Sequence, residues 1–166
     1  MKQENLFTEN CIRTFRGNYV DPFNPDPSLL FLDDIAHALS MQPRFGGHLP
    51  VFYSVAQHCV ECCRIAPNKE RRAALFHDAS EAYLIDIPSP IKKRLPEYYK
   101  AEDNLMKVLS KEFGFEYPLS QTVKEIDRTL LVLEWESVFI KTTPWKITPM
   151  SQEEARHQFI YHACRV

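Results

Sequence analysis

Several features are absent from this sequence, and each absence excludes a class of protein. No apolar run approaches the roughly 20 residues that a helix needs to cross a bilayer, so we expect no membrane partner. Its 20 basic and 22 acidic residues give a net charge of −2, which offers no basic excess for binding long nucleic acid. The start of the chain, MKQENLFTENC, contains no apolar stretch like that of a signal peptide, which predicts a cytoplasmic protein.

Cysteine pairs are also lacking. An odd number of cysteines indicates reduced thiols rather than a disulfide framework. The CxxC spacing of Cys59 and Cys62 has no second, distant pair that would complete a zinc site, so we interpret these thiols as buried core residues. The five cysteines are Cys11, Cys59, Cys62, Cys63 and Cys164.

The length and composition predict one globular domain. At 166 residues, with 45% apolar and 25% charged side chains, the chain is large enough for a core and too short to suggest two domains. We expect a single domain over 1–166, with an irregular segment over 1–30 and a helical body over 31–166. The turn Arg16-Gly17-Asn18 predicts a short β-hairpin inside the first segment.

Beyond that hairpin, strand signals are almost absent and no internal repeat is visible, whereas apolar residues recur at helical spacing. Prolines, a C-terminal glycine at Gly114 and a capping box at Ser151 and Glu154 mark the helix ends. The predicted fold class is all-α, a single-domain helical bundle. Its helices are expected over Leu32–Met41, Val51–Ile65, Glu70–Leu84, Pro96–Phe113, Ser120–Ile140 and Ser151–Cys164.

Chemistry-bearing residues are concentrated in Ala74-Leu-Phe-His-Asp-Ala-Ser-Glu-Ala-Tyr83. Adjacent His77 and Asp78 on a helix lie about 100° apart and can converge on one ion at its end. Glu81, four residues after His77, shares their face. Such polar groups amid apolar neighbours are costly to bury unless a metal or a partner compensates them.

Two further residues complete a set of metal ligands. His58 lies between apolar neighbours on the preceding helix, and Asp127 lies beside core positions of a later one. Two imidazoles and two carboxylates suit one divalent ion, with Mn, Co, Fe, Zn and Mg all left open, and leave coordination positions free for water and substrate.

This pattern of His, His-Asp and Asp resembles the HD-domain phosphohydrolases. Within them, the stretch HDASEAYLIDIPSPIK over 77–92 is similar to that of the bacterial 5′-deoxynucleotidases and the related phage deoxyadenosine triphosphohydrolases. The resemblance covers about 33–134. It implies His58, His77, Asp78 and Asp127 as metal ligands, and a homo-oligomer as the state of the protein.

The resemblance also implies roles for residues outside the ligand set. Glu81 would be the catalytic carboxylate, and Asp86 would position or activate the attacking water. Arg44 would contact the substrate, Phe45 would occupy the place of a stacking aromatic that is usually tryptophan, and Lys92 would lie near the phosphate.

The expected activity is metal-assisted hydrolysis of the phosphate ester of a (deoxy)nucleoside 5′-monophosphate, a small-molecule partner. The alternatives are a deoxynucleoside triphosphate triphosphohydrolase, which releases triphosphate, and a non-catalytic nucleotide sensor. A cyclic-nucleotide phosphodiesterase ranks below these, because the sequence shows no second ligand set for a binuclear site.

Each of these residues also has a purely structural interpretation. His58 is a satisfied core histidine in that case, Asp127 is paired with Arg128, and Asp86 caps the turn before Pro88. Glu134 shares a helix face with Asp127, and we interpret it as helix support.

Overall fold

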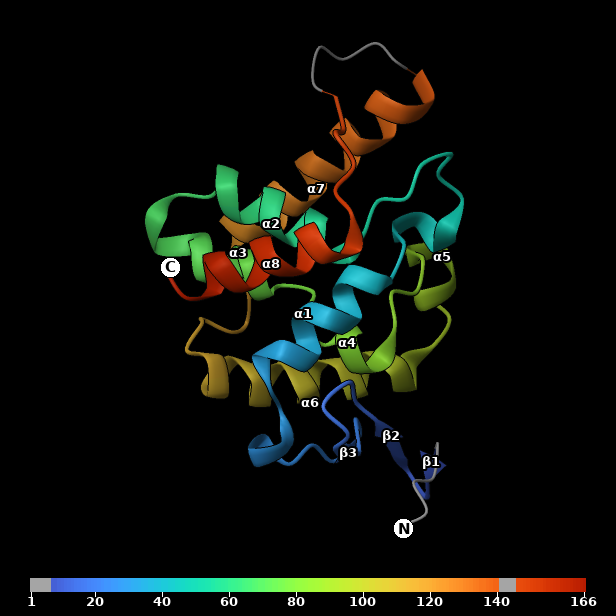
Figure 1. Ribbon diagram of the computed structural model, residues 1–166, viewed down its shortest axis with the longest axis vertical. Helices are drawn as coiled ribbons and strands as arrows, with labels where there is room; N and C mark the ends of the chain where they lie inside the picture. Colours follow the sequence, from blue (N-terminus) through green and yellow to red (C-terminus); the bar gives the residue numbers. More distant parts are fainter. Residues whose placement is uncertain (1–6, 141–145) are drawn as a thin grey trace.

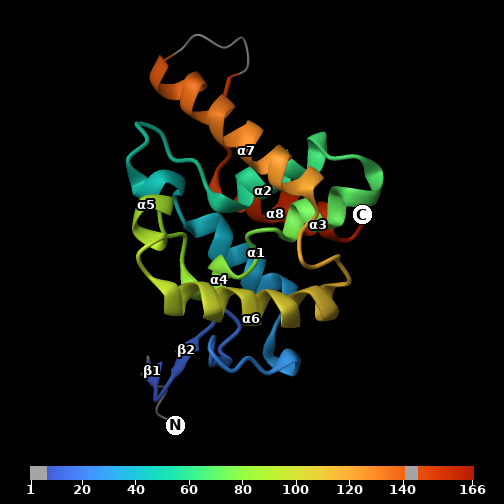
Figure 2. The same ribbon diagram turned by 180° about the vertical axis from the view of Figure 1, so that it is seen from behind.

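A computed structural model describes residues 7–140 and 146–166, and it confirms an all-α architecture with a small sheet at its amino-terminal end (Figure 1). The antiparallel strands are β1 (Phe7–Thr8), β2 (Cys11–Arg13) and β3 (Tyr19–Val20), in the order β1-β2-β3. The predicted hairpin is therefore present between β2 and β3. In both views the sheet lies on the opposite side of α6 from α7 (Figure 2).

The helical body consists of eight α-helices in the described ranges, joined by short turns. They are α1 (Leu32–Met41), α2 (Val55–Ile65), α3 (Arg71–Phe76), α4 (Glu81–Leu84), α5 (Ser89–Lys92), α6 (Pro96–Phe113), α7 (Gln121–Trp135) and α8 (Gln152–Ala163). Single 3-10 turns lie at Pro27–Leu29, Arg44–Gly47 and Asn68–Glu70, and a π-helical turn at Glu136–Ile140 extends α7. No helix within these ranges is both long and apolar enough to span a bilayer.

One apolar core lies between the helices. Helices α1 and α2 both pack against α8, and α2 also packs against α3 and α7. The Phe76 ring stacks on Phe113 and Phe115 and meets the edge of Phe159, which ties α3 to the end of α6 and to α8. This packing positions α2 and α7, which carry His58 and Asp127, and α3, which precedes the His77-Asp78 pair.

Local capping explains where the predicted helices begin and end. Ser151 accepts a hydrogen bond from Glu154 N, and Gly114 ends α6 with φ of 67°, as expected from the sequence. The helix predicted from Val51 begins instead at Val55, because Ser54 caps it and accepts from Gln57 N. Before the helix, Arg44 N donates to Tyr53 O, and Pro43 and Ser54 form an isolated antiparallel bridge.

The single helix predicted over Glu70–Leu84 is wrong, because the chain leaves the α-helix at His77 and re-enters it at Glu81. Ala79 N donates to Phe76 O and Glu81 N donates to Asp78 O, which are tighter i to i−3 bonds. His77 Nδ1 donates to Ala74 O at 2.8 Å, and such side-chain bonds compete with the regular helical ladder. The His77-Asp78 pair therefore lies at the end of a helix.

Candidate functional site

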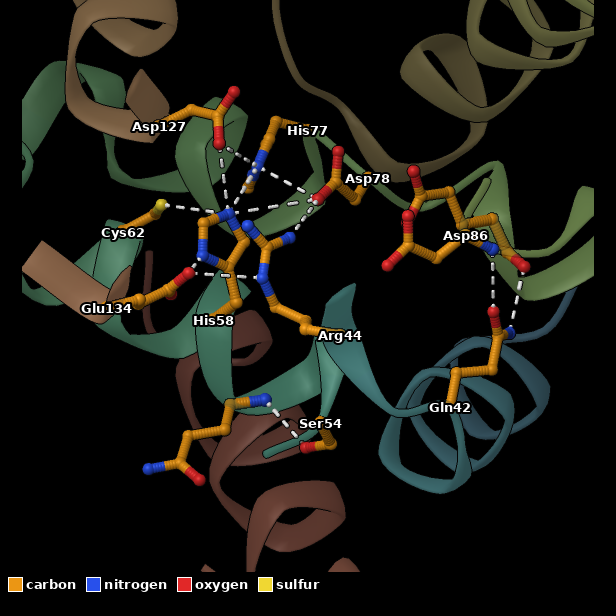
Figure 3. Close-up of polar contacts among 12 residues, drawn as sticks. Gln42, Arg44, Ser54, His58, Cys62, His77, Asp78, Asp86, Asp127 and Glu134 are labelled. Atoms are coloured by element: carbon orange, nitrogen blue, oxygen red, sulfur yellow. Dashed lines mark hydrogen bonds and ion pairs between the residues drawn. The ribbon is translucent and has the colours of Figure 1, made fainter. Parts of the chain in front are cut away.

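The four predicted ligands converge from three helices (Figure 3). His58 lies in α2, the His77-Asp78 pair follows α3, and Asp127 lies near the middle of α7. His58 Nε2 is 3.2 Å from His77 Nε2 and 3.1 Å from Asp127 Oδ1, and His77 Nε2 is 3.1 Å from Asp78 Oδ2. The two remaining nitrogen-to-oxygen pairs, between His58 and Asp78 and between His77 and Asp127, are each 3.8 Å apart.

Both histidine rings are oriented by a hydrogen bond on their other nitrogen. His77 Nδ1 donates to Ala74 O, and His58 Nδ1 donates to Glu134 Oε1 at 2.6 Å. In neutral rings the two Nε2 lone pairs then face each other across 3.2 Å. Two such lone pairs repel unless a positive charge, either a proton or a cation, lies with them.

The pKa values of the cluster also indicate that a positive charge is favoured between these side chains. Burial opposes ionisation of Asp78, yet the adjacent His77 brings its pKa down to about 2. Burial also opposes ionisation of Asp127, but hydrogen bonds from His58 and His77 outweigh the effect of burial. The pKa of Asp127 is therefore lowered. For His77, burial lowers the pKa but the carboxylate of Asp78 raises it well above its usual value. The site therefore favours positive charge, as expected of a buried group that could hold a metal ion.

The donor spacing fits a divalent metal ion. Ligand distances of about 2.0–2.2 Å place neighbouring donors of one ion roughly 3.0–3.4 Å apart, and the closer pairs here fall in that range. Histidine, cysteine and aspartate side chains of this buried group can hold a metal ion.

Two thiols that the sequence analysis left out of the site lie beside it. Cys62 Sγ is 3.7 Å from His58 Nε2, and Cys59 groups with His77 and Asp78. Both thiols are buried, and burial raises the pKa of Cys59. A sulfur donor next to imidazole nitrogen favours zinc, cobalt or iron over magnesium.

A cleft of about 360 Å³ includes Asp78 and Asp127 of this cluster in its lining. Its lining includes the predicted residues Arg44, Phe45, Glu81, Asp86 and Lys92. The complete lining is Arg44, Phe45, Asp78, Glu81, Asp86, Ile87, Pro88, Ser89, Pro90, Lys92, Asp127 and Leu131. All of the predicted site residues except His58 and His77 line this cleft, and those two lie behind it against the core.

Glu81 is the buried carboxylate of the cleft. Its Oε1 lies 3.9 Å from Lys92 Nζ, and its buried Oε2 has no hydrogen-bond partner among the described residues. Burial, together with the charges of Asp78 and Asp86, raises its pKa well above the usual value. The surroundings of Glu81 therefore favour the neutral form of its carboxyl group.

Asp86 follows a strained residue. Ile85 has φ of 69° although it is β-branched, and Asp86 N donates to Gln42 Oε1 at 3.0 Å. Phe45, which lines the same cleft, also has a positive φ, of 56°. Such strain is commonly concentrated at functional sites. Burial raises the pKa of Asp86.

Arg44 and Lys92 supply the positive charge of the cleft. Arg44 is buried, with Nη1 3.6 Å from Asp78 Oδ2 and Nε 3.2 Å from Glu134 Oε2. Lys92 Nζ is paired with Glu102. Both cations are thus held by carboxylates at the edge of the cleft rather than extended into solvent.

Interpreting Glu134 as helix support was wrong. Its side chain is fully buried and bonds to His58, Tyr53 and Arg44. The seven-residue spacing from Asp127 was the available signal, because it places both carboxylates on one face of α7. The structural alternative for Asp127 is not what the structure shows, since its carboxylate faces His58.

Two curated proteins are similar to this chain, and no protein-family model matches it. The uncharacterized protein YfdR of Escherichia coli K12 is 42% identical over 125 residues, which cover 74% of this chain and 69% of YfdR. The uncharacterized protein RCAP_rcc00048 of Rhodobacter capsulatus is 30% identical over 140 residues, covering 76% of this chain and 71% of that protein.

Proposed function

The chain belongs to the protein family of Escherichia coli YfdR, and from its site we propose that it is a metal-dependent phosphohydrolase of the HD-domain type. Its substrate in this proposal is the phosphate ester of a (deoxy)nucleoside 5′-monophosphate. The observation that carries the proposal is the convergence of His58, His77, Asp78 and Asp127 beneath a cleft that also presents Arg44.

The metal would be held by the two Nε2 atoms, Asp78 Oδ2 and Asp127 Oδ1. When bound, a divalent ion polarises a phosphoryl oxygen and makes water a better nucleophile near neutral pH. Its identity among Mn, Co, Fe, Zn and Mg is left to experiment, with Cys62 favouring the softer ions.

Binding and orientation of the phosphate fall to the cations of the cleft. Arg44 keeps N–H groups in addition to those on Glu134 and Asp78, and a guanidinium fork fixes a phosphate in geometry as well as charge. Lys92 lines the same cleft. Phe45 and Leu131 give the cleft an apolar side against which a base or sugar can pack.

Proton transfer falls to the two perturbed carboxyl groups. Burial and the neighbouring carboxylates raise the pKa of Glu81, which favours its protonated form, and that form would donate a proton to the leaving 5′-oxygen. Asp86, more open to solvent, would accept a proton from the attacking water. Groups placed in this way contribute roughly 10²–10⁴ in rate.

The alternative of a triphosphohydrolase uses the same residues on a larger substrate. Ligand cavities are usually about 300–1,000 Å³, so a cleft of about 360 Å³ lies at the small end and favours the monophosphate. A nucleotide sensor would share the binding groups, but it would have no use for a buried carboxyl group with a raised pKa at Glu81.

The test is to incubate the protein with Mn²⁺ or Co²⁺ and each deoxynucleoside mono- and triphosphate, and to assay phosphate and triphosphate separately. The Asp127→Ala variant, purified identically, controls for contaminating phosphatases. We expect phosphate from a monophosphate with the wild type alone. Triphosphate release would replace the proposal by its alternative, and nucleotide binding without turnover would favour the sensor.

A further inference from the structure

We propose that Glu134 is a positioning residue whose single buried carboxylate orients both a metal ligand, His58, and the phosphate-binding Arg44. This inference rests on the metal site of the proposed function and adds a residue to which that function assigns no role. It predicts that metal binding and phosphate binding depend on the same side chain.

Burial of this carboxylate calls for an explanation. Glu134 is 0% exposed in α7, two helical turns beyond Asp127. Removing an isolated carboxylate from water costs several kcal/mol, so such a group is found inside proteins only with good partners.

Its partners account for both oxygens, and the bonds to His58 and Arg44 can be followed in Figure 3. Oε1 accepts hydrogen bonds from His58 Nδ1 at 2.6 Å and from the Tyr53 hydroxyl at 2.8 Å. Oε2 accepts from Arg44 Nε at 3.2 Å. One carboxylate therefore joins α2, α7 and the turn that carries Arg44.

The bond to His58 decides which of its nitrogens is available for a metal ion. A proton on Nδ1, held by Glu134, leaves Nε2 as a lone pair directed at Asp127 and His77. The negative charge behind the ring also makes Nε2 a more basic ligand. Loss of such an outer partner typically weakens metal binding 10- to 100-fold.

The bond to Arg44 decides the direction of the guanidinium. With Nε occupied by Glu134, the plane of the group is fixed and Nη1 lies 3.6 Å from Asp78 Oδ2, at the wall of the cleft. A phosphate that enters the cleft then meets a fork that is already oriented.

Replacing Glu134 by glutamine separates the effect of its hydrogen bonds from the effect of its size. The Glu134→Gln side chain has nearly the same size but only one acceptor oxygen, whereas the structure uses two. If that oxygen stays with His58 and Tyr53, the amide N–H₂ group faces Arg44 Nε, and two donors repel.

The experiment measures binding rather than turnover. Mn²⁺ binding is measured by calorimetry, and inorganic phosphate binding is then measured on the Mn²⁺-saturated protein. We expect Glu134→Gln to weaken Mn²⁺ binding 10- to 100-fold and phosphate binding at least tenfold. With saturating Mn²⁺, the KM of Glu134→Gln for the nucleotide should rise by a larger factor than its kcat falls.

Two matched controls isolate the effect. Glu125→Gln removes the same charge from an exposed position of α7, and Tyr53→Phe removes one donor to Oε1 without touching His58 or Arg44. Both should bind Mn²⁺ and phosphate within about threefold of the wild type.

The outcomes separate this inference from the proposed function. Weakened binding in a protein that hydrolyses no nucleotide would support the inference and reject the function. Folded Glu134→Gln that binds both probes like Glu125→Gln would reject the inference alone. A wild type that binds no metal would overturn both.

A measurement on the wild type applies if Glu134→Gln does not fold. Protein with ¹⁵N-labelled histidine and Zn²⁺ should show His58 with its proton on Nδ1 and a strongly downfield proton signal. A proton on Nε2 of His58 instead would contradict the orientation on which the inference depends.

Discussion

Replacing Glu81 by glutamine tests the proton donor of the proposed mechanism most directly. The wild-type carboxyl is 5% exposed, and its Oε2 has no hydrogen-bond partner among the described residues. Burial and two neighbouring carboxylates raise its pKa, so it holds a proton at pH values where an ordinary glutamate has lost it. An amide cannot give up a proton, so kcat should fall roughly 10²- to 10⁴-fold, about 2.7–5.4 kcal/mol.

The same substitution should have the opposite effect on stability in metal-free protein. Because the folded-state pKa of Glu81 is raised, its contribution to the free energy of unfolding is fully present below the unfolded value of about 4.3 and is lost as pH rises through the folded value. Glutamine does not ionise and suffers no such loss. In EDTA, the variant should therefore gain stability relative to the wild type between pH 5 and pH 8.

Both effects are measured on one preparation. Steady-state rates with Mn²⁺, metal content by mass spectrometry and urea unfolding at several pH values are compared with those of Glu112→Gln, an exposed position of α6. Metal content should match the wild type, because Glu81 is not among the converging donors. A variant that keeps most of its kcat, or whose relative stability falls with pH, would refute this account of Glu81.

Three other predictions follow from the ligand cluster and the helix caps. His77→Ala should lose bound metal and hydrolysis together, as seen by metal analysis and phosphate release, whereas retained metal would exclude His77 as a ligand. Acidification should weaken Mn²⁺ binding about tenfold per pH unit for each proton that the metal ion displaces. Protons compete with the ion because Asp78 raises the pKa of His77 despite its burial. A Mn²⁺ affinity that does not change with pH in calorimetry would contradict this prediction. Gly114→Ala should lower the free energy of unfolding in urea by about 1 kcal/mol, since Gly114 has φ of 67° and only strain, not contact, opposes a methyl group there.

Much of the helical framework was predictable from local signals. The ends of α6 and α8 follow from Pro96, Gly114 and Ser151, because helix capping depends on neighbours within one turn. The break at 77–80 was not predictable in this way. It depends on a side-chain bond from His77 to Ala74 O, which apolar periodicity does not register.

The candidate site divides in the same manner. Its chemical groups were visible in the sequence as His58, the His77-Asp78 pair, Glu81 and Asp127, because imidazoles and carboxylates stand out among apolar helix residues. Their convergence, the thiol of Cys62 beside them and the role of Glu134 were decided by tertiary structure alone. The physical reason is that these atoms lie within hydrogen-bonding distance only after α2, α3 and α7 have packed, and residues up to 90 positions apart come together.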